Sequence, residues 1–343
     1  MSDIDIKQIL SGVKYPGFSR DIVSFGLVRT AEVKDDVGHL VLKFGNEKED
    51  VRQAILKEIR ATLLNAGLKD VMFQIESGQA GKGFNPETVE LPSVRHTLAV
   101  ASGKGGVGKS TVSANLAAAL SSQGQRVGIL DLDVYGPSLP VTMGIHEVPR
   151  VTDENKLVPV KKFNMELMSL GFMLSDSSPV IWRGAMVSKM VQQFLRDVAW
   201  GELDYMIIDL PPGTGDVQLT LVQRLALTGA VIVTTPQDLA LQDVQRGADM
   251  FGKVNTPVLG IIENMSYHVC SNCGHRSAIF SSGGGERESS RLNVPLLGKL
   301  PLNEEIMASA EAGHPLVLSN PEAEASKTFL DITAQLQKLI AGN

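Results

Sequence analysis

The residues with the clearest chemical potential form a glycine-rich loop in the first third of the chain. Two glycines separated by four residues precede a lysine and two hydroxyl residues, in the segment Gly103, Lys104, Gly105, Gly106, Val107, Gly108, Lys109, Ser110, Thr111. Glycines let successive backbone N–H groups surround phosphate oxygens, and a helix expected to begin near Lys109 adds the positive end of its dipole. The pattern predicts a nucleotide site, with Lys109 on the β/γ-phosphates and Ser110 on Mg²⁺.

Acidic residues follow two further apolar runs that are expected to be strands of the same sheet. Asp209 ends one such run, and Asp131 and Asp133 follow the run at 127–130. In P-loop NTPases an acid at this place holds Mg²⁺ or its bound water, and hydrolysis requires an aligned water molecule. We therefore predict that Asp209 holds Mg²⁺, that Asp131 belongs to the Mg²⁺/Lys109 network, and that Asp133 positions the attacking water.

The hydrophobic pattern divides the chain into three parts. Residues 1–76 predict a small α+β unit, and residues 77–94 are rich in glycine and polar side chains, which indicates a flexible linker. From 95 to 343, short apolar runs without alternation are separated by helical patterns, as in a parallel sheet covered by helices on both faces. The predicted fold class is α/β, with a doubly wound, mostly parallel P-loop sheet after a small α+β domain.

Composition narrows the range of partners. The net charge of −6 and the isoelectric point near 5.6 leave no basic stripe for binding nucleic acid. The chain has no apolar run of about 18 residues and no signal-peptide pattern. These features predict a cytoplasmic protein with neither a nucleic acid nor a membrane as its partner.

Taken together, the motifs resemble those of the Mrp/ApbC family of P-loop ATPases, which act as iron–sulfur cluster carriers. The segments that carry this resemblance are Gly103–Thr111, Asp131–Ser138, Trp182–Gly184, Trp200–Asp216, Glu263–Ser266 and Cys270–Cys273. They cover essentially residues 95–320. The first 76 residues are similar to the small iron–sulfur assembly domain of many bacterial members, although the cysteine that some relatives carry there is missing.

The resemblance implies a homodimeric ATP hydrolase that uses Mg²⁺ and turns over slowly. As in ATPases that dimerise face to face, Lys104 is expected to reach the partner's nucleotide, while Asn264 is expected to read the adenine edge. The catalytic set is then Lys104, Lys109, Asp133 and Asp209. The implied partners are apo iron–sulfur proteins and cluster-assembly scaffolds.

Only two cysteines occur in the chain, Cys270 and Cys273. Two thiolates cannot complete a four-cysteine cluster, but a homodimer would supply four. The implied group is a labile [4Fe–4S] cluster bridging two copies, which the protein transfers to apo-proteins. One alternative is zinc held by the same thiolates or with a neighbouring histidine, making the chain a zinc-stapled ATPase switch that positions a protein partner. A redox-active thiol pair is a further alternative.

Overall fold

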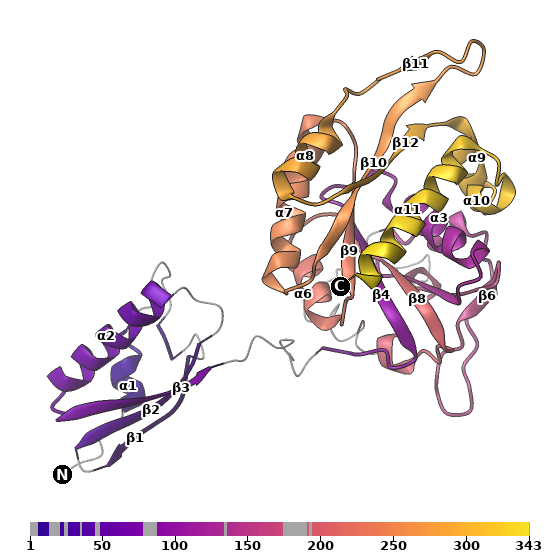
Figure 1. Cartoon of the computed structure of the whole chain (residues 1–343). Helices are drawn as coiled ribbons and strands as arrows, with labels where there is room; N and C mark the ends of the chain where they lie inside the picture. Colours follow the sequence, from indigo (N-terminus) through magenta and orange to yellow (C-terminus); the bar gives the residue numbers. More distant parts are fainter. Residues whose placement is uncertain are drawn as a thin grey trace. The chain divides into compact units, whose positions relative to one another are not determined.

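The computed structural model describes residues 6–13, 21–23, 27–34, 36–44, 49–77, 88–133, 136–173, 191 and 194–342. The chain forms two compact units, residues 1–83 and residues 84–343, which are coloured from indigo to yellow along the sequence in Figure 1. The segment Trp182–Gly184, which contributes to the family resemblance, lies outside the described residues.

The first unit is a three-stranded sheet packed on helices. Its elements are α1 (Ile6–Leu10), β1 (Val28–Lys34), β2 (Val37–Phe44), α2 (Glu49–Asn65) and β3 (Asp70–Ser77). Strand β2 pairs antiparallel with β1 and parallel with β3. The spacing of apolar residues in α2 directs Ile55, Ile59 and Leu63 inward, and all three are fully buried against Leu40 and Leu42 of β2.

The second unit is built on one large, mostly parallel sheet. Its strands are β4 (Val94–Ala101), β5 (Val127–Asp131), β6 (Val160–Lys162), β7 (Met165–Ser169), β8 (Leu203–Asp209), β9 (Gly229–Thr234), β10 (Val258–Val269), β11 (Arg276–Ser277) and β12 (Leu296–Leu302). They are arranged in the order β11-β10-β9-β4-β8-β5-β7-β6, with β12 also paired to β10. Only β6 and β11 pair antiparallel among the described strands of this sheet, so the predicted doubly wound P-loop fold is confirmed.

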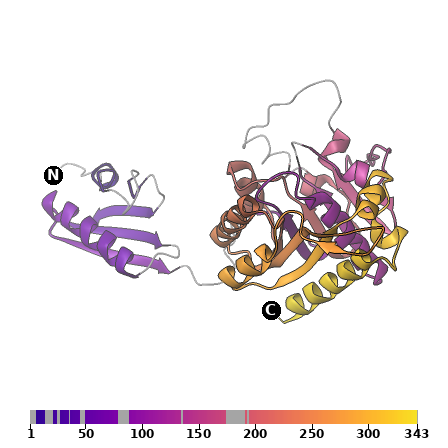
Figure 2. The same cartoon turned by 90° about the horizontal axis from the view of Figure 1, so that it is seen from above.

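Successive strand residues point to opposite sides of this sheet. Because the strands are apolar at successive positions, both faces are apolar and helices cover both of them. The helices are α3 (Lys109–Ser122), α4 (Leu139–Thr142), α6 (Asp216–Arg224), α7 (Asp238–Lys253), α8 (Gly284–Leu292), α9 (Glu304–Glu311), α10 (Leu316–Ser319) and α11 (Glu324–Ala341), with a 3₁₀ turn at Leu170–Met173. On β4, Leu98 and Val100 face the core beneath α3 and α11, whereas Ala99 faces the core beneath α6 and α7. Figures 1 and 2 show these two helical layers on either side of the strands.

The boundary between the units differs from the sequence expectation. Residues 78–87 of the expected linker lie outside the described residues, but residues 88–94 belong to the second unit. The Val89 N–H donates to the Arg224 carbonyl at 2.8 Å, and Val89 is nearly buried. The linker expected at 77–94 therefore extends too far toward the C-terminus.

The last helix packs on its own unit. In α11 the residues Phe329, Ile332, Leu336 and Ile340 are buried in the core that also contains α3. The apolar face of α11 is therefore a packing surface within the second unit. Among the helices that the structure describes, none is long and apolar enough to cross a membrane.

Candidate nucleotide site and cysteine hairpin

The glycine-rich loop connects β4 to α3 at the carboxyl edge of the sheet. Gly106 and Gly108 have φ values of +80° and +79°, in the left-handed region that favours glycine. Gly103 is required for a different reason, because an added Cβ would lie 2.0 Å from the Asp243 Cβ. The residue that caps α3 is Gly108, which has no side chain to occupy the first N–H groups of the helix. These groups can therefore bind an anion.

Lys109 lies between two carboxylates at the mouth of this loop. Its Nζ is 2.8 Å from Oδ1 of Asp209 and 3.8 Å from Oδ2 of Asp133, and the lysine side chain is almost fully buried. Ser110 donates from Oγ to Oδ2 of Asp209, and Ser113 donates to Oδ1 at 2.7 Å. The structure thus brings together four of the predicted residues, Lys109, Ser110, Asp133 and Asp209, in one polar cluster.

Asp131 lies next to this cluster, and its carboxylate accepts hydrogen bonds from neighbouring backbone and serine groups. Its Oδ1 accepts from the Asp133 N–H at 2.9 Å, and its Oδ2 accepts from the Leu139 N–H at 3.1 Å and from the Ser169 hydroxyl at 3.0 Å. Burial and the charge of Asp209 raise the pKa of Asp131 to about 7. Because both oxygens already have protein donors, the geometry favours Asp131 as the support of the loop that carries Asp133.

The two residues carried over from the family resemblance have protein partners. Lys104 extends to the start of α7, where its Nζ donates to Oε1 of Gln237 at 2.9 Å. Asn264 lies at the opposite wall of the loop. Its Nδ2 donates to the Val107 carbonyl at 2.9 Å, and its Oδ1 accepts from the Met265 N–H at 2.9 Å. Asn264 therefore fastens β10 to the phosphate loop.

A largely apolar cavity of about 330 Å³ opens beside Gly108 and Asn264. Much of its remaining wall comes from β12 and α9, including Pro301, Ile306 and Met307, and α4 contributes Val141 and Thr142. Strand β12 and helix α9 were not expected from the sequence, since their apolar residues form no long periodic pattern. Ser113 was also missed, although its position four residues after Lys109 on one helix was a usable signal.

The two cysteines lie at the tip of a hairpin that extends from the sheet. We call residues 267–277 the cysteine hairpin. Strand β10 continues to Val269 and turns back into β11, with the Cys270 N–H donating to the His275 carbonyl at 3.0 Å and the Gly274 N–H donating to the Cys270 carbonyl at 2.9 Å. Gly274 has a φ of +69°, which the tight turn requires.

Neither cysteine belongs to a disulfide in this structure, and both side chains reach the surface. Cys270 is partly exposed and Cys273 is exposed. Hydrogen bonds from the Cys273 and Asn272 N–H groups and from the Cys273 thiol lower the pKa of Cys270, which favours the thiolate that binds metals. Within the described part of the chain, no group of three or more His, Cys, Asp or Glu residues could hold a metal ion. One chain therefore offers two cysteine ligands and an incomplete site.

Comparison with known proteins agrees with this combination of features. The model of the NUBPL iron-transfer P-loop NTPases, of the ParA type, matches residues 93–337. The chain belongs to this family. A TM-score of 0.61 and 38% identity relate it to the ADP complex of a nucleotide-binding protein from Archaeoglobus fulgidus, over 70% of this chain and 93% of that one. The Pyrococcus furiosus cell-division ATPase MinD, 22% identical with a TM-score of 0.55, shares the fold over 71% of this chain and 99% of its own.

Curated relatives cover nearly the whole chain. The iron–sulfur cluster carrier protein of Haemophilus influenzae is 42% identical over 96% of this chain and 90% of the relative. The carriers of Deinococcus radiodurans and Escherichia coli K12 are 43% and 38% identical, over 95% and 97% of this chain and 92% and 89% of their own. The family resemblance read from the motifs, and with it the class of iron–sulfur carrier P-loop NTPase, is confirmed.

Proposed function

We propose that this P-loop NTPase is a slow Mg²⁺-dependent ATPase whose homodimer carries a labile [4Fe–4S] cluster and transfers it to apo-proteins. The observation that supports this most directly is that an intact phosphate loop shares one rigid sheet with an exposed, incomplete pair of cysteine ligands. A nucleotide site alone would need no such hairpin. A closed structural metal site would need more than two ligands in one chain.

The nucleotide half of the proposal rests on the cluster around Lys109. With ATP bound, the lysine is expected to leave Asp209 and neutralise the β/γ-phosphates, since phosphate oxygens would offer it more negative charge. The Ser110 hydroxyl and the Asp209 carboxylate are oxygen donors of the kind that Mg²⁺ prefers, so these residues fit the ion. Mg²⁺ would supply charge neutralisation on the transferred phosphoryl group. Asp133, steered by Asp131, would then orient the water.

The base and the second lysine have separate assignments. The cavity of about 330 Å³ next to Gly108 is the proposed adenine pocket, because it is apolar and continuous with the phosphate loop. Asn264 keeps one N–H and one lone pair for the base edge. In the dimer, the Lys104 side chain would leave Gln237 and contact the nucleotide bound to the partner subunit. The ADP bound to the Archaeoglobus fulgidus protein supports a nucleotide here.

The cluster is the cargo of the protein, and the thiols determine how it is held. Two cysteines from each of two copies make the four ligands of a [4Fe–4S] cluster. Exposed ligands on a projecting turn leave the cluster open to an approaching acceptor. We propose apo iron–sulfur proteins and assembly scaffolds as partners, the cytoplasm as the compartment, and residues 1–76 as an assembly-like accessory domain.

Anaerobic reconstitution with iron and sulfide tests the cluster. The measurements are iron, sulfide and zinc per dimer, the visible spectrum, and transfer to an apo-acceptor. We expect about four irons per dimer with absorbance near ~400 nm, both lost in Cys270→Ser and Cys273→Ser while ATPase activity remains. A wild-type spectrum unchanged by either substitution would refute the assignment of these ligands.

One alternative is favoured by a specific observation. Two backbone hydrogen bonds close the turn at residues 270–274 and keep the two cysteines close together, so the same thiolates from two copies would complete a four-thiolate zinc site. In that case the protein is a zinc-stapled nucleotide switch. One zinc per dimer after anaerobic reconstitution, with no iron and no transfer, would establish this alternative.

A further inference from the structure

One acidic side chain fastens the cysteine hairpin to the body of its unit. Glu324 is the first residue of α11, and its Oε1 accepts hydrogen bonds from the Tyr267 hydroxyl at 3.0 Å and from the Arg276 guanidinium at 2.6 Å. The guanidinium carbon of Arg276 also lies 4.9 Å from the centre of the Tyr267 ring. Because Tyr267 belongs to β10 and Arg276 to β11, Glu324 connects both legs of the hairpin to one point.

Glu324, Tyr267 and Arg276 form a network of two hydrogen bonds and a ring contact at the surface. Partial burial and the hydrogen bond to Glu324 raise the pKa of Tyr267 to about 12, so the phenol remains a donor at neutral pH. Glu324 is about half exposed, and its single oxygen serves two donors from different strands. Such a three-membered network is more geometrically restrictive than one exposed pair between flexible side chains.

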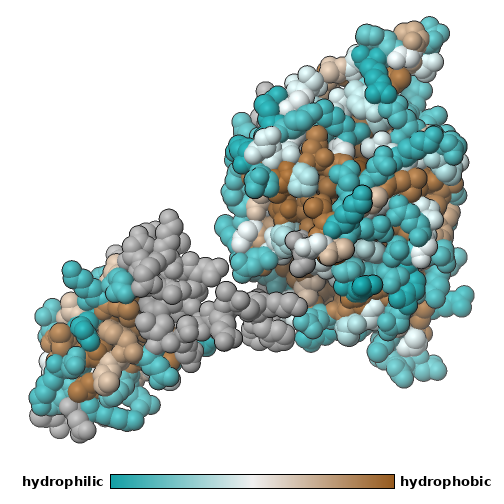
Figure 3. All heavy atoms as spheres, viewed as in Figure 1, coloured by the Kyte–Doolittle hydropathy of each residue, from teal (hydrophilic) through white to brown (hydrophobic). Residues whose placement is uncertain are grey.

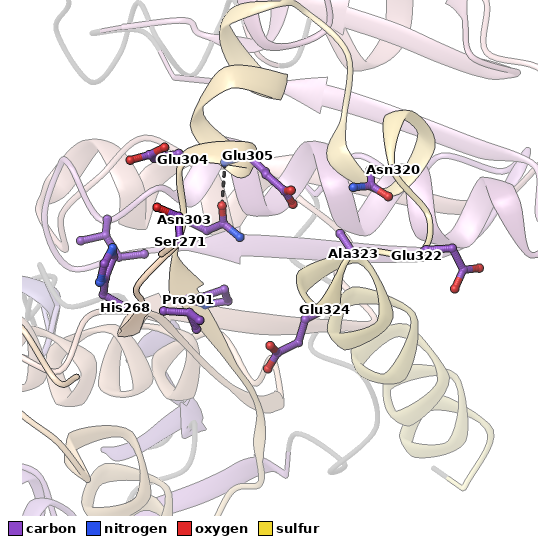
Figure 4. A pocket seen from close by; sticks show the side chains of 12 residues that line it. His268, Ser271, Pro301, Asn303, Glu304, Glu305, Asn320, Glu322, Ala323 and Glu324 are labelled. Atoms are coloured by element: carbon purple, nitrogen blue, oxygen red, sulfur yellow. Dashed lines mark hydrogen bonds between the residues drawn. The ribbon is translucent and has the colours of Figure 1, made fainter. Parts of the chain in front are cut away.

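A cavity of about 550 Å³ lies between the hairpin and the helices beneath it. Figure 4 shows His268 and Ser271 of the hairpin on one side of this cavity and Glu324, with Glu322, at the start of α11 on the other. Over the hairpin itself the surface is mixed and largely hydrophilic (Figure 3). The hairpin is thus suspended over an open space on this side, where the polar contacts of Glu324 restrain it.

We propose that Glu324 is a positioning residue for cluster binding, which holds the turn with Cys270 and Cys273 in the orientation that two copies need to ligate one cluster. The inference rests on the proposed cluster function and adds to it the residue that pre-organises the ligands. Thiolates that are already oriented lose less conformational freedom when they bind. Releasing the hairpin therefore weakens cluster retention without touching the nucleotide site.

The test uses full-length protein and two independent measurements. The first is amide hydrogen exchange of the hairpin in the metal-free protein, for wild type, Glu324→Ala, Glu324→Gln and the control Glu322→Ala. Glu322 lines the same cavity but is 87% exposed and pairs with Lys327 at 3.0 Å, so its removal leaves the hairpin contacts intact. We expect the fastest exchange in Glu324→Ala, intermediate exchange in Glu324→Gln because it keeps an acceptor for Tyr267, and wild-type exchange in Glu322→Ala.

The second measurement is the rate at which a ferrous chelator removes iron from the reconstituted dimer. From the ordinary strength of hydrogen bonds to a charged group, we expect release to be about threefold to tenfold faster in Glu324→Ala, with ATPase activity equal to wild type. Iron release from Glu324→Gln should be intermediate between wild type and Glu324→Ala, and Glu322→Ala should release iron at the wild-type rate.

The outcomes separate this proposal from the one on which it rests. Unchanged exchange in Glu324→Ala would show that Glu324 does not hold the hairpin, and faster exchange with unchanged iron release would show that its hold has no bearing on the cluster. Either result overturns the positioning role while the cluster function stands. A wild-type protein that forms no cluster overturns both, and the exchange data then report only the anchoring of the hairpin.

Discussion

The substitution Gly108→Ala should reduce nucleotide affinity by more than its effect on the stability of the protein explains. Gly108 has a φ of +79°, and an added Cβ would lie 2.3 Å from Nδ2 of Asn264. Two costs follow. A left-handed conformation costs a non-glycine residue about 1–2 kcal/mol. In addition, Asn264 must move, which breaks its buried hydrogen bond to the Val107 carbonyl and costs about 1–3 kcal/mol.

Two other glycines provide matched controls for Gly108→Ala. Gly106, in the same loop, has a φ of +80°, and Gly124, at the far end of α3, has a φ of +84°. At both positions an added Cβ would meet no atom within 4 Å. The variant Gly124→Ala should therefore lose about 1–2 kcal/mol of stability from backbone strain alone and keep full nucleotide affinity. Gly106→Ala adds the same strain inside the loop without the clash.

The assay is titration with a fluorescent ADP analogue, beside thermal unfolding of each variant. The combined cost of about 2–5 kcal/mol at Gly108 predicts a loss of nucleotide affinity of roughly 30- to 4000-fold if the bound state requires the native loop. Gly106→Ala should lose less. The double variant Gly108→Ala/Asn264→Ala removes the clashing amide, so its loss should be smaller than the sum of the two single losses. Equal affinity in Gly108→Ala and Gly124→Ala would refute the reasoning.

Three further predictions concern charged groups. Lys109→Ala should abolish nucleotide binding or hydrolysis in an ADP titration and a phosphate-release assay, and unchanged activity would contradict the phosphate site. Lys104→Ala should preserve nucleotide binding by the monomer but reduce hydrolysis. In wild type the hydrolysis rate per chain should rise with protein concentration as dimers form, and in Lys104→Ala it should stay flat. Paired contacts with Arg126 lower the pKa of Asp204 to about 2, so their contribution to stability is complete above the unfolded-state pKa near ~4 and is lost as the pH falls toward 2. Urea unfolding should accordingly show Arg126→Gln to be less stable than wild type at pH 6, with most of this deficit gone at pH 2 as Asp204 becomes protonated; an equal deficit at both pH values would exclude this ion pair as the cause.

Much of the nucleotide site could be predicted because its determinants are local. The phosphate loop is one continuous segment, and the placement of its glycines, Lys109 and Ser110 depends on backbone geometry over a few residues. The strands of the second unit are short apolar runs, which burial on both faces requires in any parallel sheet. The spacing of the two cysteines marked them as a pair, whereas their proposed role as cluster ligands came from the family resemblance.

Tertiary structure decided which of these groups meet. Asp209 and Asp131 both follow apolar strands, but β8 lies beside β4 whereas β5 lies one strand farther away, so Asp209 contacts Lys109 and Asp131 supports Asp133 from behind. Strand order results from packing the whole chain, and no local pattern encodes it. The contact of Glu324 with Tyr267 joins residues 57 positions apart and depends on the docking of α11. The residue types and spacings thus determined the chemistry available to this protein, and long-range packing determined where each group acts.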